Sequence, residues 1–409
     1  MFRSLPVAAG SLPGLFLAAS LALGLTACGP TTASPPPTAQ APAVQQTAPA
    51  PRLGEVDLSG PVQVALLAPL TGADSGAAEA GRALANAAQM ALTDLADPSL
   101  RLKVYDTSGS PEGARAAAQA AVGDGAALIL GPLFGANTPG VAGIAVRAGL
   151  NVISFSTDSS VAGGPVFLSG FLPEAEAERM VNFAASQGLD RIGVFYPRTA
   201  YGDAALRAAE DAAFRTGARV AVAYNYERTF EGIQDGAEPF AGAARDAGVT
   251  AVLLPEGGKG LQTVGAFMDY HGLNPAVVKY LGLGQWNAGA TLMEPTLRGG
   301  WFPAPDPDRV EIFSNLYQAR FGSRPPFIAV LGYDAVQVAG QLLADARRSG
   351  WTRPFGHDEL TRAEGFQGAL GPLRFGPDGL SQRAMAILEV DTGGFLIVDP
   401  APAWLGPGS

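Results

Sequence analysis

Cysteine and histidine are scarce in this chain of 409 residues, which holds one cysteine and two histidines. A single cysteine excludes an intramolecular disulfide framework and a metal site built from paired cysteines. The histidines, His271 and His357, do not have the spacing of metal ligands. The sequence also lacks a GxSxG elbow, a Walker loop and a GxGxxG fingerprint. We therefore predict that the protein is not an enzyme and that it uses no cofactor or metal.

Basic residues are too few and too scattered to form a nucleic-acid-binding surface. The chain has 27 Lys and Arg against 37 Asp and Glu, a formal net charge of −10 at pH 7. Its Lys and Arg residues form no runs along the sequence. Proteins that bind nucleic acid present a basic face to the phosphate backbone. The sequence therefore predicts no nucleic-acid partner.

The apolar stretch near the N-terminus is too short to cross a bilayer. Arg3 supplies a positive start, and residues 12–25 are mainly Leu, Ala, Gly and Phe, whereas a spanning helix takes about 20 apolar residues. Such a stretch is typical of a secretory signal. It ends at Leu25-Thr26-Ala27-Cys28, which resembles the bacterial lipobox, where the Cys is lipidated. We predict a signal peptide over residues 1–27 and a lipid anchor on Cys28.

Residues 28–60 are predicted to form the lipidated cysteine and a disordered tether. They are rich in Pro, Ala and Thr with few large apolar side chains, so they cannot bury enough surface to offset chain entropy. Gly29 stands in place of the Asp that signals retention at the inner membrane. No later segment holds 18 consecutive apolar residues. We predict a periplasmic protein that contacts a membrane through its lipid anchor only. In a Gram-negative cell, this membrane is expected to be the outer membrane.

From residue 61 onward, short apolar runs alternate with Ala-rich helical stretches in two successive rounds. In the first expected helix, Leu84, Ala88 and Ala91 recur at i, i+4 and i+7 and so share one face. The expected strands are residues 62–70, 100–107, 127–133 and 151–156 in the first round, and 191–196, 219–226, 251–254 and 279–284 in the second. Strands that alternate with helices predict parallel sheets. Two such open α/β units predict two lobes, with ligand loops at the carboxyl ends of the strands.

The C-terminal part contains more chain than a second α/β unit needs. Helices are expected over residues 308–321 and 334–348, and a turn at Pro377-Asp378-Gly379 joins two further strands. We therefore expect this part to cross back between the lobes. The predicted division assigns residues 61–170 and 304–371 to lobe 1, and residues 171–303 and 372–409 to lobe 2.

Six segments of the sequence resemble, in the same order, segments of the type I periplasmic binding proteins. They are VQVALLAPLTG at 62–72, YDTSGSPEGARAAAQAAV at 105–122, LILGPLFGANTPGVAGIAVRAGLNVISFSTDSS at 128–160, YPRTAYGDAALRAA at 196–209, LGYDAVQVAGQLL at 331–343 and GPLRFGPDG at 371–379. The resemblance covers nearly all of residues 61–399. It implies an α/β fold with two open parallel-sheet lobes, joined by three crossovers, that closes on a small solute without catalysing a reaction.

The resemblance leaves two functions open. The best-known members of the family that this chain resembles are the leucine/isoleucine/valine-binding proteins, which deliver amino acids to an inner-membrane ABC permease. A subgroup of lipoproteins, the penicillin-binding protein activators, binds a penicillin-binding protein and regulates peptidoglycan synthesis. The segments LLPEGG at 253–258 and GGWFPAPDP at 299–307 are similar to that subgroup. The small-molecule receptor for ABC import is the first hypothesis, and the cell-wall regulator is the alternative.

The residues that the resemblance places at the ligand differ from those of amino-acid binders. Gly135 stands where such binders usually carry Ser, and Asp158 stands where they usually carry Thr. A carboxylate at 158 would repel the carboxylate of an amino acid. The predicted ligand-binding residues are Gly135, Ser156, Asp158, Tyr201, Glu256, Gln285, Trp286 and Tyr333.

Several of these residues also have a structural explanation, and Tyr201 could serve only to begin a helix at the edge of a lobe. Ser156 and Asp158 could cap the segment that follows them, and Glu256 could belong to a plain strand-to-helix turn. Trp286 could pack in the core, and Tyr333 could serve only to begin a helix.

Overall fold

The computed structural model describes residues 54–405, which form two large sheets and one small one. The predicted signal peptide, Cys28 and most of the predicted tether lie outside the described residues. Among the helices of residues 54–405, none has the length and apolarity that a membrane-spanning helix needs.

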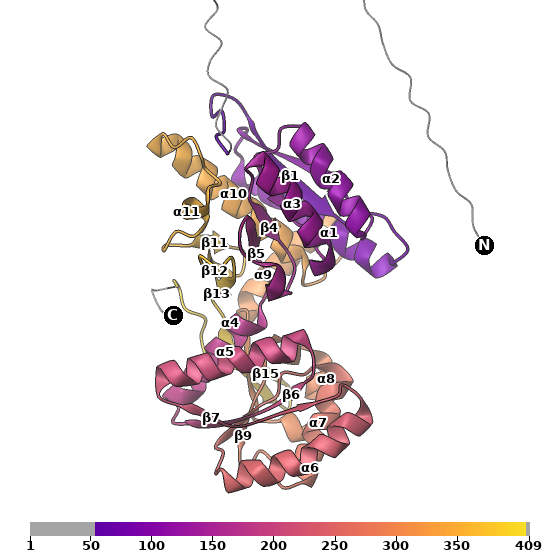
Figure 1. Ribbon diagram of the computed structural model, residues 1–409, viewed down its shortest axis with the longest axis vertical. Helices are drawn as coiled ribbons and strands as arrows, with labels where there is room; N and C mark the ends of the chain where they lie inside the picture. The colour runs from indigo at the N-terminus through magenta and orange to yellow at the C-terminus, as the bar shows by residue number, and fades with distance from the viewer. Residues whose placement is uncertain (1–53, 406–409) are drawn as a thin grey trace, which may run out of the picture. The chain divides into compact units, whose positions relative to one another are not determined.

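The first sheet has five strands in the order β2-β1-β3-β4-β5, all parallel (Figure 1). Its strands are β1 (Val62–Ala68), β2 (Leu100–Asp106), β3 (Leu128–Leu130), β4 (Val152–Ser154) and β5 (Val166–Leu168). The helices between them are α1 (Ser75–Leu95), α2 (Pro111–Gly123) and α3 (Thr138–Ala148). This arrangement confirms the strand–helix alternation that the first round of the sequence predicted.

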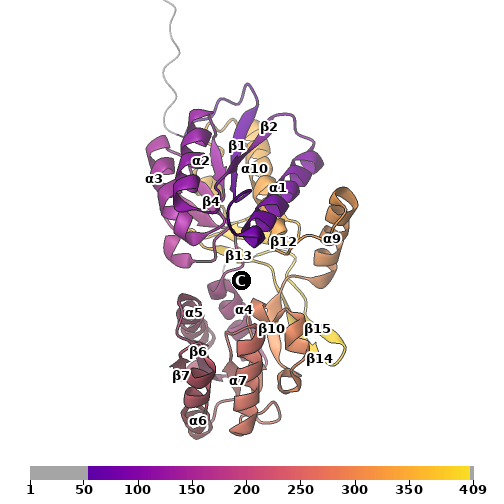
Figure 2. The same ribbon diagram turned by 90° about the vertical axis from the view of Figure 1, so that its right-hand side faces the viewer.

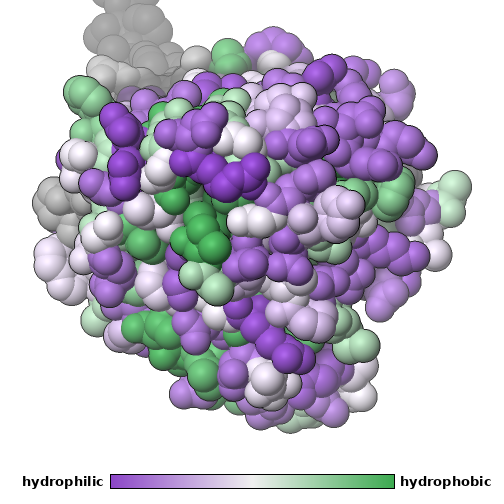
Figure 3. Space-filling model, turned by 90° about the horizontal axis from the view of Figure 1, so that it is seen from below, coloured by the Kyte–Doolittle hydropathy of each residue, from purple (hydrophilic) through white to green (hydrophobic). Residues whose placement is uncertain are grey.

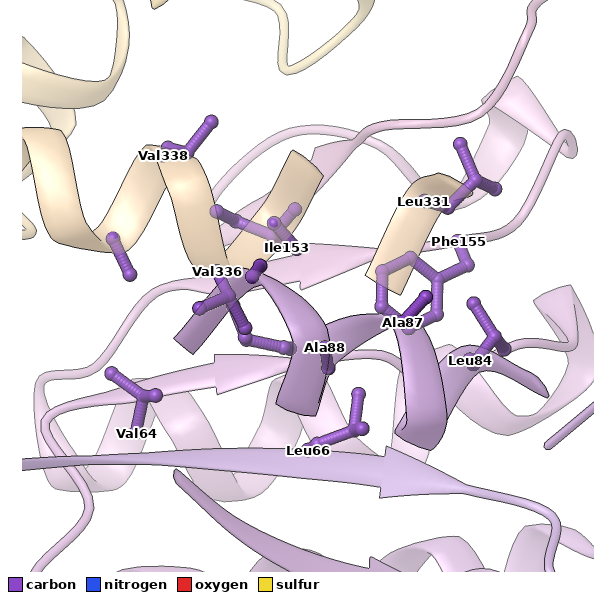
Figure 4. Packing of buried hydrophobic residues seen from close by; sticks show 14 of the residues in the cluster. Val64, Leu66, Leu84, Ala87, Ala88, Ile153, Phe155, Leu331, Val336 and Val338 are labelled. Atoms are coloured by element: carbon purple, nitrogen blue, oxygen red, sulfur yellow. The ribbon is translucent and has the colours of Figure 1, made fainter. Parts of the chain in front are cut away.

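The two faces of the first sheet are covered by different helices. Side chains of alternate strand residues such as Val64 and Leu66 pack against α1 and α10 (Ala329–Ser349), as Figure 4 shows for Leu84, Val336 and their neighbours. The residues between them, such as Ala65 and Leu67, pack against α2 and α3. Both faces are therefore covered, which explains why β3, β4 and β5 are nearly continuous buried apolar runs, whereas β2 at the edge of the sheet contains the polar Arg101 and Lys103.

The second sheet has seven strands in the order β15-β14-β10-β9-β8-β6-β7 (Figure 2). Its strands are β6 (Arg191–Pro197), β7 (Arg219–Tyr226), β8 (Ala251–Leu253), β9 (Lys279–Leu281), β10 (Trp301–Ala304), β14 (Ala386–Asp391) and β15 (Gly394–Asp399). Helices α4 (Pro173–Ser186) and α5 (Ala200–Thr216) pack in one core cluster of this sheet, and α6 (Phe230–Asp246) and α7 (Gly258–Tyr270) in another. The strands from β6 to β10 are parallel, while β14 and β15 form an antiparallel hairpin at the edge.

The chain passes three times between the residues that pack with the two large sheets. It passes first from β5 to α4, and then from β10 to α9 (Pro307–Phe321), which packs with α10 in the core of the first sheet. The third passage runs through the small antiparallel sheet of β11 (Phe366–Gly368), β12 (Gly371–Phe375) and β13 (Ser381–Arg383) to β14. The short helices α8 (Gly289–Leu292) and α11 (His357–Leu360) complete the fold. Leu373 and Phe375, which the predicted division assigns to lobe 2, pack in the core of the first sheet.

Candidate ligand-binding site

At the carboxyl edge of the first sheet, the loops that follow β3 and β4 bring three predicted residues into contact. A Cβ atom placed on Gly135 would lie 2.9 Å from Ser156 Oγ and 3.0 Å from Asp158 Cβ. Successive parallel strands end at the same edge, so loops that are 20 residues apart in sequence become neighbours. The same contacts leave no room for a serine at position 135 unless Ser156 or Asp158 moves.

Ser156 and Asp158 cap the segment that follows them. The buried Ser156 hydroxyl accepts a hydrogen bond from the Asp158 N–H at 3.0 Å. Asp158 Oδ1 in turn accepts hydrogen bonds from the N–H and the hydroxyl of Ser160, at 3.1 and 2.6 Å. The capping explanation is therefore confirmed for both residues, and the exposed Asp158 carboxylate already has local donors.

Asp106, at the end of β2, is hydrogen-bonded to the loop that follows β1. The sequence did not predict it as a site residue. It accepts hydrogen bonds from the N–H groups of Leu70, Thr71 and Ser108, at 2.8 to 3.2 Å, and from the Thr71 hydroxyl. Partial burial acts to raise the pKa of Asp106, but these donors, led by the Thr71 hydroxyl, outweigh it and lower the pKa to about 2. Asp106 therefore stays ionised, and it fixes the exposed Thr71 and Ser108 at this edge.

A buried carboxylate lies beneath the carboxyl edge of the second sheet. Glu176 Oε2 accepts hydrogen bonds from the Tyr201 hydroxyl and the Gly284 N–H, both at 3.1 Å. Burial raises the pKa of Glu176 to about 7, although both hydrogen bonds act in the opposite direction. Burial and the nearby Glu176 carboxylate raise the pKa of Tyr201 well above its ordinary value. The predicted ligand residue Tyr201 thus uses its hydroxyl to hold Glu176, which the sequence did not reveal as a partner.

The Glu256 carboxylate likewise has all its hydrogen-bond partners within the protein. Its side chain is 1% exposed and accepts hydrogen bonds from Arg228 at 2.8 to 3.2 Å, from the Tyr226 hydroxyl at 3.1 Å and from the Gly257 N–H at 2.9 Å. Its negative charge is matched by the Arg228 guanidinium, which is 57% exposed. Glu256 therefore cannot hold the ammonium group of a ligand unless Arg228 leaves it.

An open pocket of about 740 Å³ lies over this ion pair. It is lined by Arg228, Lys259 and Gln285, together with neighbouring residues of α6 and α7. Lys259 has no ion-pair partner within residues 54–405. The N-cap residue of helix α7 is Gly257, which supplies no side-chain cap, so the first N–H groups of the helix add to the positive potential. The pocket has the charge to hold an anion.

Two predicted site residues are placed elsewhere by the structure. Trp286 is fully buried in the core of the second sheet, and its indole N–H donates to the Leu254 carbonyl at 3.1 Å. Its interpretation as a ligand contact is therefore corrected, because no surface of its ring is exposed to a ligand. The Tyr333 hydroxyl donates to Asp94 in α1 at 3.0 Å, and its ring packs on Phe313 in α9. The packing of α10 against α1 and α9 thus explains the presence of Tyr333 without a ligand contact.

The comparisons with known proteins cover nearly all of the two-sheet region. The sequence model of the family described as "Periplasmic binding protein" matches residues 61–394. Among solved structures, the chain is similar to a Rhodospirillum rubrum protein assigned to branched-chain amino acid ABC transport. The TM-score is 0.70 at 19% identity, over 83% of this chain and 100% of that chain.

Two further similar structures contain a bound solute. A solute-binding protein of an ABC transporter from Rhodopseudomonas palustris BisB5 holds 3,4-dihydroxybenzoic acid (TM-score 0.57, 19% identity, 85% of this chain and 99% of that chain). A branched-chain amino acid transporter substrate-binding protein from Streptococcus pneumoniae holds isoleucine (TM-score 0.54, 15% identity, 83% and 100%). At these identities the likeness shows the fold alone, and it confirms the predicted fold class. No curated protein matches the chain. Because the family match spans most of its length, the chain belongs to the periplasmic binding protein family.

Proposed function

We propose that this protein is the non-catalytic substrate-binding component of an ABC importer and that its solute is a small organic carboxylate. Membership of the family implies an extracytoplasmic location. One observation supports this choice of solute: the Glu256 carboxylate is already neutralised by an ion pair with Arg228. Lys259 then leaves the pocket with a net positive charge, which attracts an anionic ligand.

The first sheet would contribute hydroxyl groups to the same solute, while the charge of Asp106 at this edge is held by hydrogen bonds from Leu70, Thr71 and Ser108. Ser156 and the exposed Thr71 and Ser108 lie at its carboxyl edge. An α-amino acid would need, in addition, an acid for its ammonium group. Asp158 is the exposed carboxylate at this edge, and its Oδ1 atom already accepts two hydrogen bonds from Ser160. The arrangement therefore supports a carboxylate without an α-amino group better than an amino acid.

The alternative function, regulation of a penicillin-binding protein, receives no support from the comparisons. The family match and the three similar structures concern periplasmic binding proteins and ABC transporters. We therefore propose an inner-membrane ABC permease as the protein partner.

The choice of solute can be tested by ligand-dependent stabilisation of the purified protein. Propionate and lactate are expected to raise the melting temperature, because a ligand at 100 times its Kd adds about 2.7 kcal/mol to the free energy of unfolding. L-leucine is expected to bind more weakly. Lys259→Gln should weaken carboxylate binding by about tenfold and reduce its dependence on salt.

Lys103→Gln is the matched control, because Lys103 on strand β2 pairs with Asp124 at the end of α2 and does not line the pocket. It should bind both acids as the wild type does. Stabilisation by L-leucine but by neither acid would overturn the carboxylate assignment and favour an amino-acid receptor. The absence of stabilisation by any of the three compounds would contradict the proposed capture of a small solute.

Lipidation of Cys28 also remains a proposal, since this residue lies outside the described part of the chain. Cells grown with an alkyne-tagged palmitate are expected to incorporate the tag into the wild-type protein. Cys28→Ser should abolish labelling and release the protein into the soluble periplasmic fraction. Labelling that persists in Cys28→Ser would show that the lipid is absent from this cysteine.

A further inference from the structure

The second sheet ends on one side in a strand that has no partner beyond it. β15 is the last strand in the sheet order and pairs with β14 alone, and Figure 2 shows this hairpin at the border of the sheet. No backbone hydrogen bond joins β15 to any other segment of residues 54–405. An edge strand presents unpaired N–H and C=O groups along its outer side. A further strand can therefore be added to the outer side of β15.

The exposed side chains of β15 are apolar. Hydrophobic side chains reach the surface of this protein in separate patches, as the face in Figure 3 illustrates. On β15 three of them are consecutive: Leu396, Ile397 and Val398 are 52%, 45% and 40% exposed. The strand carries no charge from Gly394 to Val398. Its pairing with β14 is regular from Phe395 to Ile397 and shifts register only beyond Ile397. A run of exposed apolar residues of this length is unfavourable in water unless it forms a contact.

The other edges of the two large sheets are protected against such pairing. β2 carries the exposed Arg101 and Lys103, and β7 begins with the exposed Arg219. Charged side chains on an edge strand hinder its pairing with another chain. β5 is buried, and its Leu168 N–H donates to the Gly379 carbonyl at 2.8 Å. Among the four edges of these sheets in residues 54–405, β15 is the one with neither a charged residue before its last position nor a covering segment.

The sequence of β15 is complementary to a second copy of itself. Two copies can pair antiparallel about a twofold axis, which is the commonest symmetry of homo-oligomers. An axis at Leu396 places Phe395 of each copy opposite Ile397 of the other, so that apolar side chains face each other across the pair. An axis at Phe395 would instead set Asp391 opposite Asp399, and like charges that face each other destabilise a strand pair. The charges therefore favour the axis at Leu396.

We propose that the protein forms a homodimer in which the β15 strands of two copies pair antiparallel about Leu396 and join their second sheets into one. The formal net charge of −10 opposes self-association, and the uncharged stretch of β15 lets two copies approach without opposed like charges. A pair of short strands buries less surface than a standard interface, so the dimer exchanges with monomer. Lys259 follows β8, four strands from β15 in the sheet order, so the dimer leaves its pocket open and does not depend on the proposed function.

Sedimentation velocity of the purified Cys28→Ser protein tests the dimer, because this variant lacks the proposed lipid and cannot associate through it. The average mass should rise toward twice that of the monomer between about 1 and about 100 µM protein. Leu396→Lys in the same background should weaken the dimer by about tenfold or more, because a charged edge resists pairing. Val146→Lys is the control, since Val146 is an exposed residue of α3, which packs on the first sheet. Equal melting temperatures by circular dichroism would show that both variants fold.

A single engineered thiol tests the position of the twofold axis. Cys28 is the only cysteine of the chain, so Leu396→Cys in the Cys28→Ser background provides one thiol per copy. Residues that face each other in an antiparallel pair lie about 4.5–5.5 Å apart, within reach of a disulfide. Mild oxidation should therefore link Leu396→Cys into a covalent dimer and leave Val146→Cys monomeric.

Three results would overturn the proposal. The first is a protein that stays monomeric at every concentration, and the second is a dimer that Leu396→Lys leaves as stable as Val146→Lys does. The third is a dimer that oxidation of Leu396→Cys does not capture, since the strands would then not pair about this residue. None of these results bears on carboxylate binding, which is measured separately by ligand-dependent stabilisation.

Discussion

Replacing Asp334 with alanine is expected to lower the free energy of unfolding by about 3–5 kcal/mol, because it leaves a buried guanidinium without its counter-ion. The Asp334 carboxylate is buried and accepts a hydrogen bond from Arg383 Nη1 at 2.7 Å and from the Ala369 N–H at 2.7 Å. Arg383, only 7% exposed, also donates twice to the Ser169 carbonyl, at 3.0 and 2.7 Å. Urea denaturation followed by circular dichroism would measure the loss.

The location of this ion pair gives it a role beyond its contribution to stability. Ser169 follows β5 on the first passage of the chain, Asp334 belongs to α10, and Arg383 ends β13 on the third passage. The Arg383 guanidinium also lies over the Phe171 ring, 4.7 Å from its centre. The ion pair therefore ties two of the connecting segments to the core of the first sheet. We expect Asp334→Ala to loosen these segments before it affects the sheets.

The exposed ion pair of Glu311 and Arg324 provides the control. Both of its side chains are more than half exposed, and such pairs contribute little because water already solvates them. Glu311→Gln should therefore leave the unfolding midpoint unchanged. The double variant Asp334→Leu with Arg383→Met should recover most of the stability, since it removes both buried charges. Equal losses of unfolding free energy for Asp334→Ala and Glu311→Gln would contradict the prediction that the buried ion pair contributes more to stability than the exposed one.

The parts of the fold that the sequence predicted are those that depend on local periodicity. Strand runs such as residues 62–70 and helical stripes such as Leu84, Ala88 and Ala91 depend on neighbours a few residues away, and both are confirmed. Parallel strands end at one edge, so the meeting of Gly135, Ser156 and Asp158 could also be predicted. The antiparallel pairing of β14 and β15 with the second sheet could not, because periodicity does not tell which edge a strand joins.

The hydrogen-bond and ion-pair partners of the buried carboxyl groups could not be predicted, because they depend on contacts between distant segments. Glu176 and Gly284 are 108 residues apart, and Arg383 and Asp334 are 49 apart. Glu256 was predicted as a ligand-binding residue, but the group that it holds is the guanidinium of Arg228, 28 residues earlier. A sequence pattern shows that a carboxylate follows a strand, but only the folded chain shows which donor reaches it.

The stability of the protein is expected to fall as the pH rises from about 4.5 to about 7, because Glu176 holds its proton in the folded state. Burial raises the pKa of Glu176 from its ordinary 4.5 to about 7. Between these values the unfolded chain has released the proton and the folded chain retains it, so a rise in pH favours unfolding. Each pKa unit corresponds to about 1.4 kcal/mol, so the fall is on the order of 3 kcal/mol.

Glu176→Gln isolates this contribution, since an amide has the shape of the protonated acid and cannot ionise. Its oxygen can still accept the hydrogen bonds of Tyr201 and Gly284, because both reach the same atom, Oε2. The variant should match the wild type at pH 4 and exceed its free energy of unfolding by up to about 3 kcal/mol at pH 8. Urea denaturation at a series of pH values from 4 to 8 would measure the difference between the two proteins.

Two further variants decide whether the pH dependence comes from the Glu176 carboxyl itself. Glu178→Gln changes an acid two residues along the same helix, which pairs with Arg215 near the surface, and it should leave the slope between pH 4.5 and 7 unchanged. Tyr201→Phe removes a hydrogen bond that favours ionised Glu176, so the pKa should rise further and the fall in stability should extend above pH 7. A slope that is the same in the wild type and in Glu176→Gln would show that Glu176 is ionised in the folded protein. The buried carboxylate beneath Tyr201 and Gly284 would then be a fixed negative charge, and the second sheet would be less suited to an anionic solute.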